Sequence, residues 1–250
     1  MKAAQIHPSS FRLHPSAEWL ALFAAAVFPT LATWLYFVRL SDSAPALQQT
    51  VYMGNKILQL GFPVFWVVVV RRQGLRWWRP STAGVVEGLL FGAVVVAGMF
   101  LFYFAWLKPG GYLAASVAPI AAKAAKLGMG SPLRFAAGAI GISVANSLAE
   151  EYYWRWFLFG GLRRLMPPVI AALASSVAFA AHHVILLAIY LGGISWLTVL
   201  FSLGVAIGGA AWAWIYHRRG SLLGPWLSHL MIDAGIFIVG YNLISASLSH

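Results

Sequence analysis

Long uninterrupted runs of apolar residues dominate this chain, and their length suits helices that cross a membrane. The stretches "VFWVVVV" and "LLFGAVVVAGMFLFYFAW" show no alternation of polar and apolar positions, which argues against the strands of a β-barrel. A helix needs about 20 residues to cross the hydrocarbon core. The pattern predicts spans at residues 17–38, 50–70, 84–106, 132–159, 168–190, 196–216 and 222–245.

The predicted fold class is therefore all-α, a polytopic membrane helical bundle of about seven to eight transmembrane helices. Residues 1–250 are expected to form a single integral membrane domain. The eighth element would arise if the helix around His182 and His183 were split or re-entrant. The longest polar interruption, 107–131, has a middle part that is expected to form a short helix lying at the membrane interface.

Composition supports this class. Hydrophobic residues make up 61% of the chain and charged residues 9%, and the mean hydropathy is +0.79, far from a soluble domain. The net charge of +11 comes partly from short loops near the tryptophans at 77 and 78, which favours anchoring at lipid headgroups over nucleic-acid binding. The absence of cysteine excludes disulfides, thiolate catalysis and cysteine-ligated zinc.

Basic residues divide unequally between the two sides of the predicted bundle. With seven spans, ten fall on one side and five on the other, which predicts a cytoplasmic N-terminus, in what we expect to be a prokaryotic cytoplasmic membrane. The ten are Lys2, Arg12, Arg71, Arg72, Arg76, Arg79, Arg163, Arg164, Arg218 and Arg219, and the five are Arg39, Lys108, Lys123, Lys126 and Arg134.

Small residues recur at helical spacing in two of the spans. Gly84, Gly88 and Gly92 are four residues apart, as are Gly204 and Gly208. Glycines at this spacing let two helices approach closely, so we expect a role in packing.

The few acidic residues fall into two groups. Glu18, Asp42 and Glu87 lie near span ends or in a loop, where a charge is easily solvated. Glu150, Glu151 and Asp233 lie well inside predicted spans. An ionisable residue there costs at least roughly 2.5 to 3.5 kcal/mol, so these three are expected to have a function.

Helical spacing separates the roles of the two adjacent glutamates. Glu151 and Arg155 are four residues apart with the acid first, the favourable order for an ion pair. Glu150 is turned about 100° from Glu151, so the same pair need not neutralise it. Glu151 is therefore predicted to be structural, and Glu150 to be free to react.

Two further clusters contain histidine. "FAAHH" includes His182 and His183, and "HLMID" places His229 and Asp233 on one helical face. A lone intramembrane histidine is often only a hydrogen bond between helices. Carboxylates and histidines on three separate spans favour instead a convergent site for general acid–base chemistry.

Taken in order, three motifs resemble those of the CPBP family of intramembrane proteases, which includes the type II CAAX prenyl proteases and the bacteriocin-processing (Abi) proteins. "EEYYWR" matches E-E-x-x-x-R, "FAAHH" matches F-x-x-x-H ending at His183, and "HLMID" matches H-x-x-x-N/D. The resemblance covers about residues 132–245, the protease-like core of the chain. It implies an all-helical membrane fold and hydrolysis of a peptide bond in or near the bilayer.

The resemblance also implies a role for each residue. Glu150 and His183 would activate the attacking water, while His229 and Asp233 would stabilise the tetrahedral oxyanion. Glu151 and Arg155 would support and orient the site. Asp233 stands where asparagine would donate a hydrogen bond, and an ionised carboxylate would repel an oxyanion. It would therefore be protonated, or would fix the tautomer of His229.

Water activated by a glutamate requires no cofactor. A divalent metal is left open, since two histidines and a glutamate can bind zinc although the motif H-E-x-x-H is absent. The expected partners are the lipid bilayer and a membrane-associated peptide or protein substrate (CAAX-like, a peptide precursor or a C-terminal sorting tail), and not nucleic acid.

Two other functions are open. A proton-coupled transporter would use the acids and histidines as a relay, although no inverted repeat of hydropathy is visible. A catalytically silent membrane scaffold or immunity protein could share the fold, although the complete set of motif residues argues against lost activity.

Overall fold

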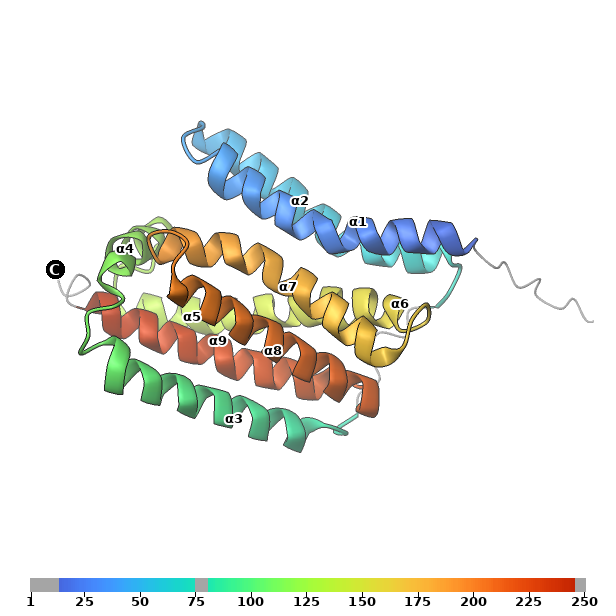
Figure 1. Ribbon diagram of the computed structural model, residues 1–250. Helices are drawn as coiled ribbons and strands as arrows, with labels where there is room; N and C mark the ends of the chain where they lie inside the picture. Colours follow the sequence, from blue (N-terminus) through green and yellow to red (C-terminus); the bar gives the residue numbers. More distant parts are fainter. Residues whose placement is uncertain (1–13, 75–80, 246–250) are drawn as a thin grey trace, which may run out of the picture.

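The computed structural model describes residues 14–74 and 81–245, and within these the regular structure is entirely helical (Figure 1). The first part contains α1 (Pro15–Trp34), η1 (Leu35–Arg39), α2 (Pro45–Phe65), η2 (Trp66–Val70), α3 (Val85–Phe102), η3 (Tyr103–Leu107), η4 (Ala114–Ser116) and α4 (Val117–Lys126). The second contains α5 (Pro132–Glu150), η5 (Glu151–Phe159), α6 (Gly160–Leu162), α7 (Pro168–Tyr190), α8 (Trp196–Arg219) and α9 (Leu223–Ile244). All of the η segments are π-helical except η4, a 3₁₀-helix.

The predicted class, a polytopic helical membrane protein, is confirmed. Six segments of the described residues are long and apolar enough to cross a membrane: Pro15–Arg39, Pro45–Val70, Val85–Leu107, Pro168–Tyr190, Trp196–Arg219 and Leu223–Ile244. Large side chains such as Leu90 and Leu101 point outward from these segments. Exposed apolar surface on this scale suits a lipid environment.

The remaining predicted span, 132–159, differs from the other six in composition. The element formed by α5, η5 and α6 runs beside the other long helices (Figure 1). It carries Arg134, Glu150, Glu151 and Arg155 along its length, which explains why it does not qualify as a span by apolar composition. Glu150, Glu151 and Arg155 belong to the site described below.

The connections confirm one sequence expectation and exclude another. Residues 107–131 contain the short helix α4, as expected. Helix α7 is continuous through His182 and His183, so the proposed break at this point is absent.

Helix starts follow ordinary capping rules, since Ser131 and Ser195 accept hydrogen bonds from the first turns of α5 and α8.

The two groups of basic residues lie at opposite ends of the bundle. The described cations of the larger group follow η2 and α6 or lie in the last turn of α8, at the end of the bundle near α6 in Figure 1. Those of the smaller group lie at the end near α4. Lys2, Arg12, Arg76, Arg79 and the tryptophans at 77 and 78 lie outside the described residues. A cytoplasmic N-terminus stays a prediction.

Glycine packing holds α3 against α9. A β-carbon added to Gly88 would lie 2.1 Å from the Gly224 carbonyl oxygen, and one added to Gly92 would lie 3.2 Å from the Ser228 Cα. The two backbones therefore touch, as the spacing in α3 predicts. This contact supports the helix that carries His229.

The prediction does not hold for the second glycine pair. A β-carbon added to Gly204 would have no neighbouring atom within 4 Å. The atoms nearest to one added to Gly208 belong to Trp212 of the same helix. Gly209 instead faces α7, where an added β-carbon would lie 3.2 Å from Phe179 and Ser176. Helix spacing alone could not distinguish a face that meets lipid from one that meets α7.

Candidate active site

The site begins where α5 changes into a π-helix. Glu150 is the last residue of α5, and η5 starts at Glu151. π-helical segments are uncommon and frequently lie at functional sites. Here the segment is held by buried aromatic residues, and the Tyr153 hydroxyl donates to the Ala25 carbonyl at 2.6 Å. The two glutamates are therefore positioned by a firmly packed element.

Glu151 makes the predicted ion pair and a second contact that the sequence did not reveal. Its Oε1 lies 3.2 Å from Arg155 Nη1 and accepts a hydrogen bond from His229 Nδ1 at 2.8 Å. The Glu151 side chain is 0% exposed. Residues 151 and 229 are far apart in the chain, so no local spacing could have indicated this link.

Arg155 is enclosed by aromatic rings. Its guanidinium carbon lies 4.5 Å from the centroid of Phe179 and 4.9 Å from that of Trp212. Cation–π contacts of this kind partly replace water around the buried charge. Arg155 therefore joins η5 to α7 and α8, which agrees with a supporting role.

Two contacts fix the ring of His229, a stacking contact on one face and a hydrogen bond at Nδ1. The imidazole stacks on Trp212, with centroids 4.2 Å apart and planes at 15°, and Trp212 Nε1 donates to Ser228 Oγ at 3.0 Å. Glu151 holds Nδ1, so the orienting contact comes from Glu151 rather than from Asp233. A carboxylate on one ring nitrogen sets the direction in which the other points.

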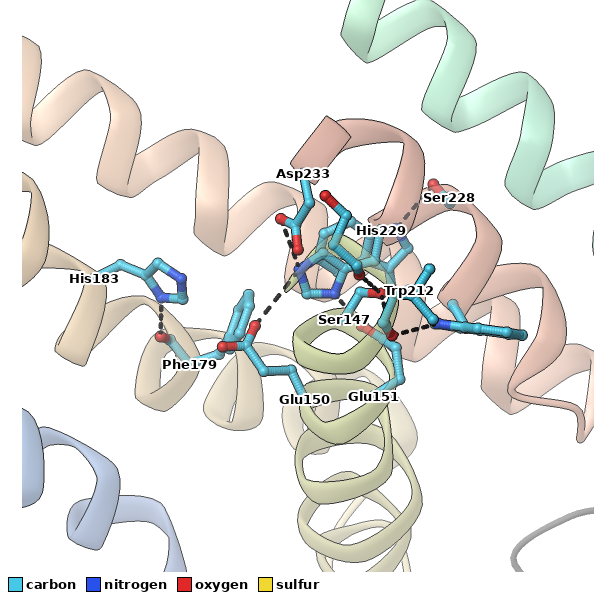
Figure 2. Close-up of polar contacts among 12 residues, drawn as sticks. Ser147, Glu150, Glu151, Phe179, His183, Trp212, Ser228, His229 and Asp233 are labelled. Atoms are coloured by element: carbon cyan, nitrogen blue, oxygen red, sulfur yellow. Dashed lines mark hydrogen bonds and ion pairs between the residues drawn. The ribbon is translucent and has the colours of Figure 1, made fainter. Parts of the chain in front are cut away.

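The other nitrogen of His229 faces two carboxyl groups. Nε2 lies 3.5 Å from Glu150 Oε2 and 3.6 Å from Asp233 Oδ1 (Figure 2). Since Nδ1 already carries a hydrogen, an unprotonated Nε2 would present its lone pair to both carboxylates. A hydrogen on Nε2 would instead point toward both carboxyl groups. It would be a hydrogen-bond donor at the centre of the site.

His183 presents a free acceptor toward the same space. Its Nδ1 lies 2.9 Å from the Phe179 carbonyl oxygen, which can only accept, so Nδ1 carries the hydrogen and Nε2 the lone pair. Figure 2 shows the Glu150 carboxylate between His183 and His229. The Glu150 side chain is 12% exposed, and its Oε2 has no hydrogen-bond partner among the described residues.

His182 also lies beside Glu150, although the helical repeat predicts that only one of the two histidines faces it. Its ring is parallel to that of Trp154, at 5.5 Å and 4°, and its buried Nδ1 lacks a hydrogen-bond partner in the described structure. Glu150, His182 and His183 each offer one ligand atom, and these atoms lie within 4.8 Å of one another.

These three side chains could hold a divalent metal. Two imidazoles and one carboxylate form a donor set that catalytic zinc sites use. Zinc–ligand distances of about 2.0–2.2 Å imply ligand atoms roughly 3.4 Å apart. The present separations would have to shorten by small side-chain movements. The set fits such an ion, which when bound would supply Lewis acidity.

Fold and site together define a class: a helical membrane protein with a buried carboxylate–imidazole cluster contributed by η5, α5, α7 and α9. Residues 132–235 match the family model for Type II CAAX prenyl endopeptidase Rce1-like proteins. The match confirms the predicted resemblance to the CPBP family over this segment, and the matched family is a family of proteases. No curated protein and no solved structure gives a significant match to the chain.

Proposed function

We propose that this protein is an intramembrane endopeptidase that hydrolyses a peptide bond of a membrane-associated substrate. The observation that carries the proposal is the position of Glu150. Its Oε2, which accepts no hydrogen bond among the described residues, lies near the acceptor side of His183 and 3.5 Å from Nε2 of His229. A base and a donor thus face one small volume, as acyl-group hydrolysis requires.

In the proposed reaction, Glu150 removes a proton from a water molecule whose other hydrogen is held by Nε2 of His183. The water oxygen bonds to the carbonyl carbon, and the carbonyl oxygen becomes an oxyanion. The Nε2–H group of His229, with Asp233 beside it, donates a hydrogen bond to that oxyanion. Glu150 then gives its proton to the amine as the C–N bond breaks, which leaves a carboxylic acid and a free amine.

The depth of the site supports a substrate that is itself associated with the membrane. His229 is six residues from the start of α9, which corresponds to about 9 Å. His183 is fifteen residues from the start of α7, which corresponds to about 22 Å. A scissile bond must therefore enter the helical layer. The proposed substrates are a CAAX-like terminus, a peptide precursor or a C-terminal sorting tail.

Substitution of Glu150 by glutamine tests the proposal, because the amide keeps the size of the side chain but cannot accept the proton. Membrane proteomes of cells with the wild-type chain and with Glu150→Gln would be compared, and the cleaved peptide then used with protein reconstituted in liposomes. Loss of general-base catalysis predicts a decrease of about 10²- to 10⁴-fold. Asp42→Asn, a substitution in the exposed loop between α1 and α2, serves as the control.

The same liposomes distinguish the enzyme from a proton-coupled transporter. A protease cleaves its peptide without an ion gradient. Gradient-driven transport that Glu150→Gln abolishes, together with no cleavage of any candidate substrate, would overturn the proposal. A chain with neither activity would favour the silent scaffold.

A further inference from the structure

A second polar site lies away from the carboxylate–imidazole cluster. A cavity of about 570 Å³ lies between the ends of η2, α6 and α8, and the side chains that line it include Arg71, Arg163, Arg164, Trp156 and Tyr216. Arg163 follows Glu150 by thirteen residues, beyond η5 and α6, and the described residues that line the cavity include neither Glu150 nor a histidine of the cluster. The cavity is therefore separate from the site proposed for hydrolysis.

One carboxylate partly neutralises the arginines of this cavity. Glu18 forms ion pairs with Arg71 and with Arg164, the latter at 2.9 Å, and accepts from Trp66 Nε1 at 3.1 Å. The residue is only 8% exposed. The expectation that Glu18 would be solvated at a span end is therefore wrong, because α1 packs against partners distant in sequence. The cavity lining contains three guanidinium groups, and Glu18 pairs with two of them, which leaves an excess of two positive charges.

Arg163 carries the uncompensated charge. Its guanidinium lies 5.6 Å from the Phe159 ring centroid and 5.4 Å from that of Tyr216. In the part of the chain that the structure describes, its side chain has neither an ion-pair nor a hydrogen-bond partner. Aromatic faces hold a guanidinium in position but do not neutralise it. Its planar donors remain available, and their geometry matches a phosphate group.

The position of the cavity favours an anion from the membrane. Helical segments end here at Val70, Leu162 and Arg219, so the cavity lies where the bundle leaves the apolar layer. Trp156 and Tyr216 line its wall, and such aromatic residues are common at the depth of lipid headgroups. Arginine clusters at this depth attract anionic lipids.

We propose that this cavity binds a phosphate anion, held by Arg163 with support from Arg164 and Arg71. The phosphodiester of an anionic lipid headgroup and free phosphate share this chemistry. The location at the end of the apolar layer favours the lipid. Binding at this site would anchor the ends of η2, α6 and α8 to one headgroup.

Binding can be measured without reference to any enzymatic activity. The full chain, purified in an uncharged detergent, would be titrated separately with dihexanoyl phosphatidylglycerol, dihexanoyl phosphatidylcholine and inorganic phosphate. Arg163→Gln removes the proposed ligand. Arg218→Gln removes the same charge from an exposed side chain at the same end of the bundle and is the matched control.

The expected result is that wild type prefers phosphatidylglycerol to phosphatidylcholine. Arg163→Gln should weaken this binding about tenfold, the effect of losing one charged hydrogen-bonded contact, while Arg218→Gln does not. Binding of inorganic phosphate with the same dependence on Arg163 would support the site with free phosphate as the source.

Three results would overturn the proposal: wild type that binds neither anion, wild type that binds no phosphate and shows no preference between the two lipids, or equal losses in Arg163→Gln and Arg218→Gln. If Arg163→Gln does not fold, Arg163→Lys keeps the charge but loses the planar fork. That variant should show a weakened binding that lies between wild type and the loss expected for the glutamine. Binding by Arg163→Lys as strong as that of wild type would contradict a phosphate held by the guanidinium.

Discussion

Replacement of Arg155 by alanine should destabilise the fold strongly, because it leaves Glu151 buried without its charge partner. The two side chains are 2% and 0% exposed, and their charged atoms are 3.2 Å apart. Removing one member of a buried pair typically costs 3–5 kcal/mol. Both terminal nitrogens of Arg155 lack an aligned hydrogen bond among the described residues, so we expect about 3 kcal/mol, near the lower end.

The measurement is thermal unfolding of the purified chain in detergent. For a chain of this size, about 3 kcal/mol corresponds to a decrease in Tm of roughly 6–12 °C. The control is Arg219→Ala, which breaks an ion pair with Glu87 whose side chains are 40% and 37% exposed. An exposed pair contributes about 0–1 kcal/mol, so this variant should unfold close to wild type.

A double variant separates charge from packing. Glu151→Gln combined with Arg155→Met removes both charges and retains most of the volume, so it should recover part of the lost stability. The reasoning is refuted if Arg155→Ala costs no more stability than Arg219→Ala. Unchanged stability together with lost cleavage would instead assign Arg155 to substrate binding or to the reaction itself.

Four further outcomes follow from the site and the packing. His183→Ala should reduce cleavage about 10²-fold or more while His182→Ala remains largely active in the same peptide assay, and the reverse order would contradict the assignment. Chelators should leave cleavage unchanged, whereas added zinc should inhibit wild type more than His182→Ala. Asp233→Asn should cleave within about tenfold of wild type, because the amide still donates, but Asp233→Ala should not. Gly88→Ala should lower the unfolding free energy by about 1–3 kcal/mol, whereas Gly98→Ala, which faces open space, should not.

Local patterns in the sequence were sufficient for the helices and for one ion pair. Apolar length predicts the spans because the hydrocarbon core sets a minimum helix length. The Glu151–Arg155 contact follows from four-residue spacing, and it forms although the backbone there is π-helical rather than α-helical. Both features depend on residues close in the chain.

Contacts between distant segments were not predictable in this way. The Glu151–His229 hydrogen bond joins η5 to α9, and Glu18 joins α1 to Arg71 and Arg164. Each depends on which helices become neighbours, which hydropathy does not specify. The motifs indicated that the glutamates at 150 and 151 converge with His183 and His229. They did not indicate which histidine nitrogen faces which carboxylate.

The arrangement of the ionisable groups supports local acid–base chemistry over a relay. Glu151 is paired with Arg155, while Glu150 and Asp233 both lie near Nε2 of His229. These groups meet at one nitrogen, with separations of 3.5 and 3.6 Å, rather than following one another across the bundle. A relay moves a proton along the membrane normal and gains nothing from such clustering. Hydrolysis takes a proton from water and returns it to an amine in the same place, and for that a base and a donor must face the same atom.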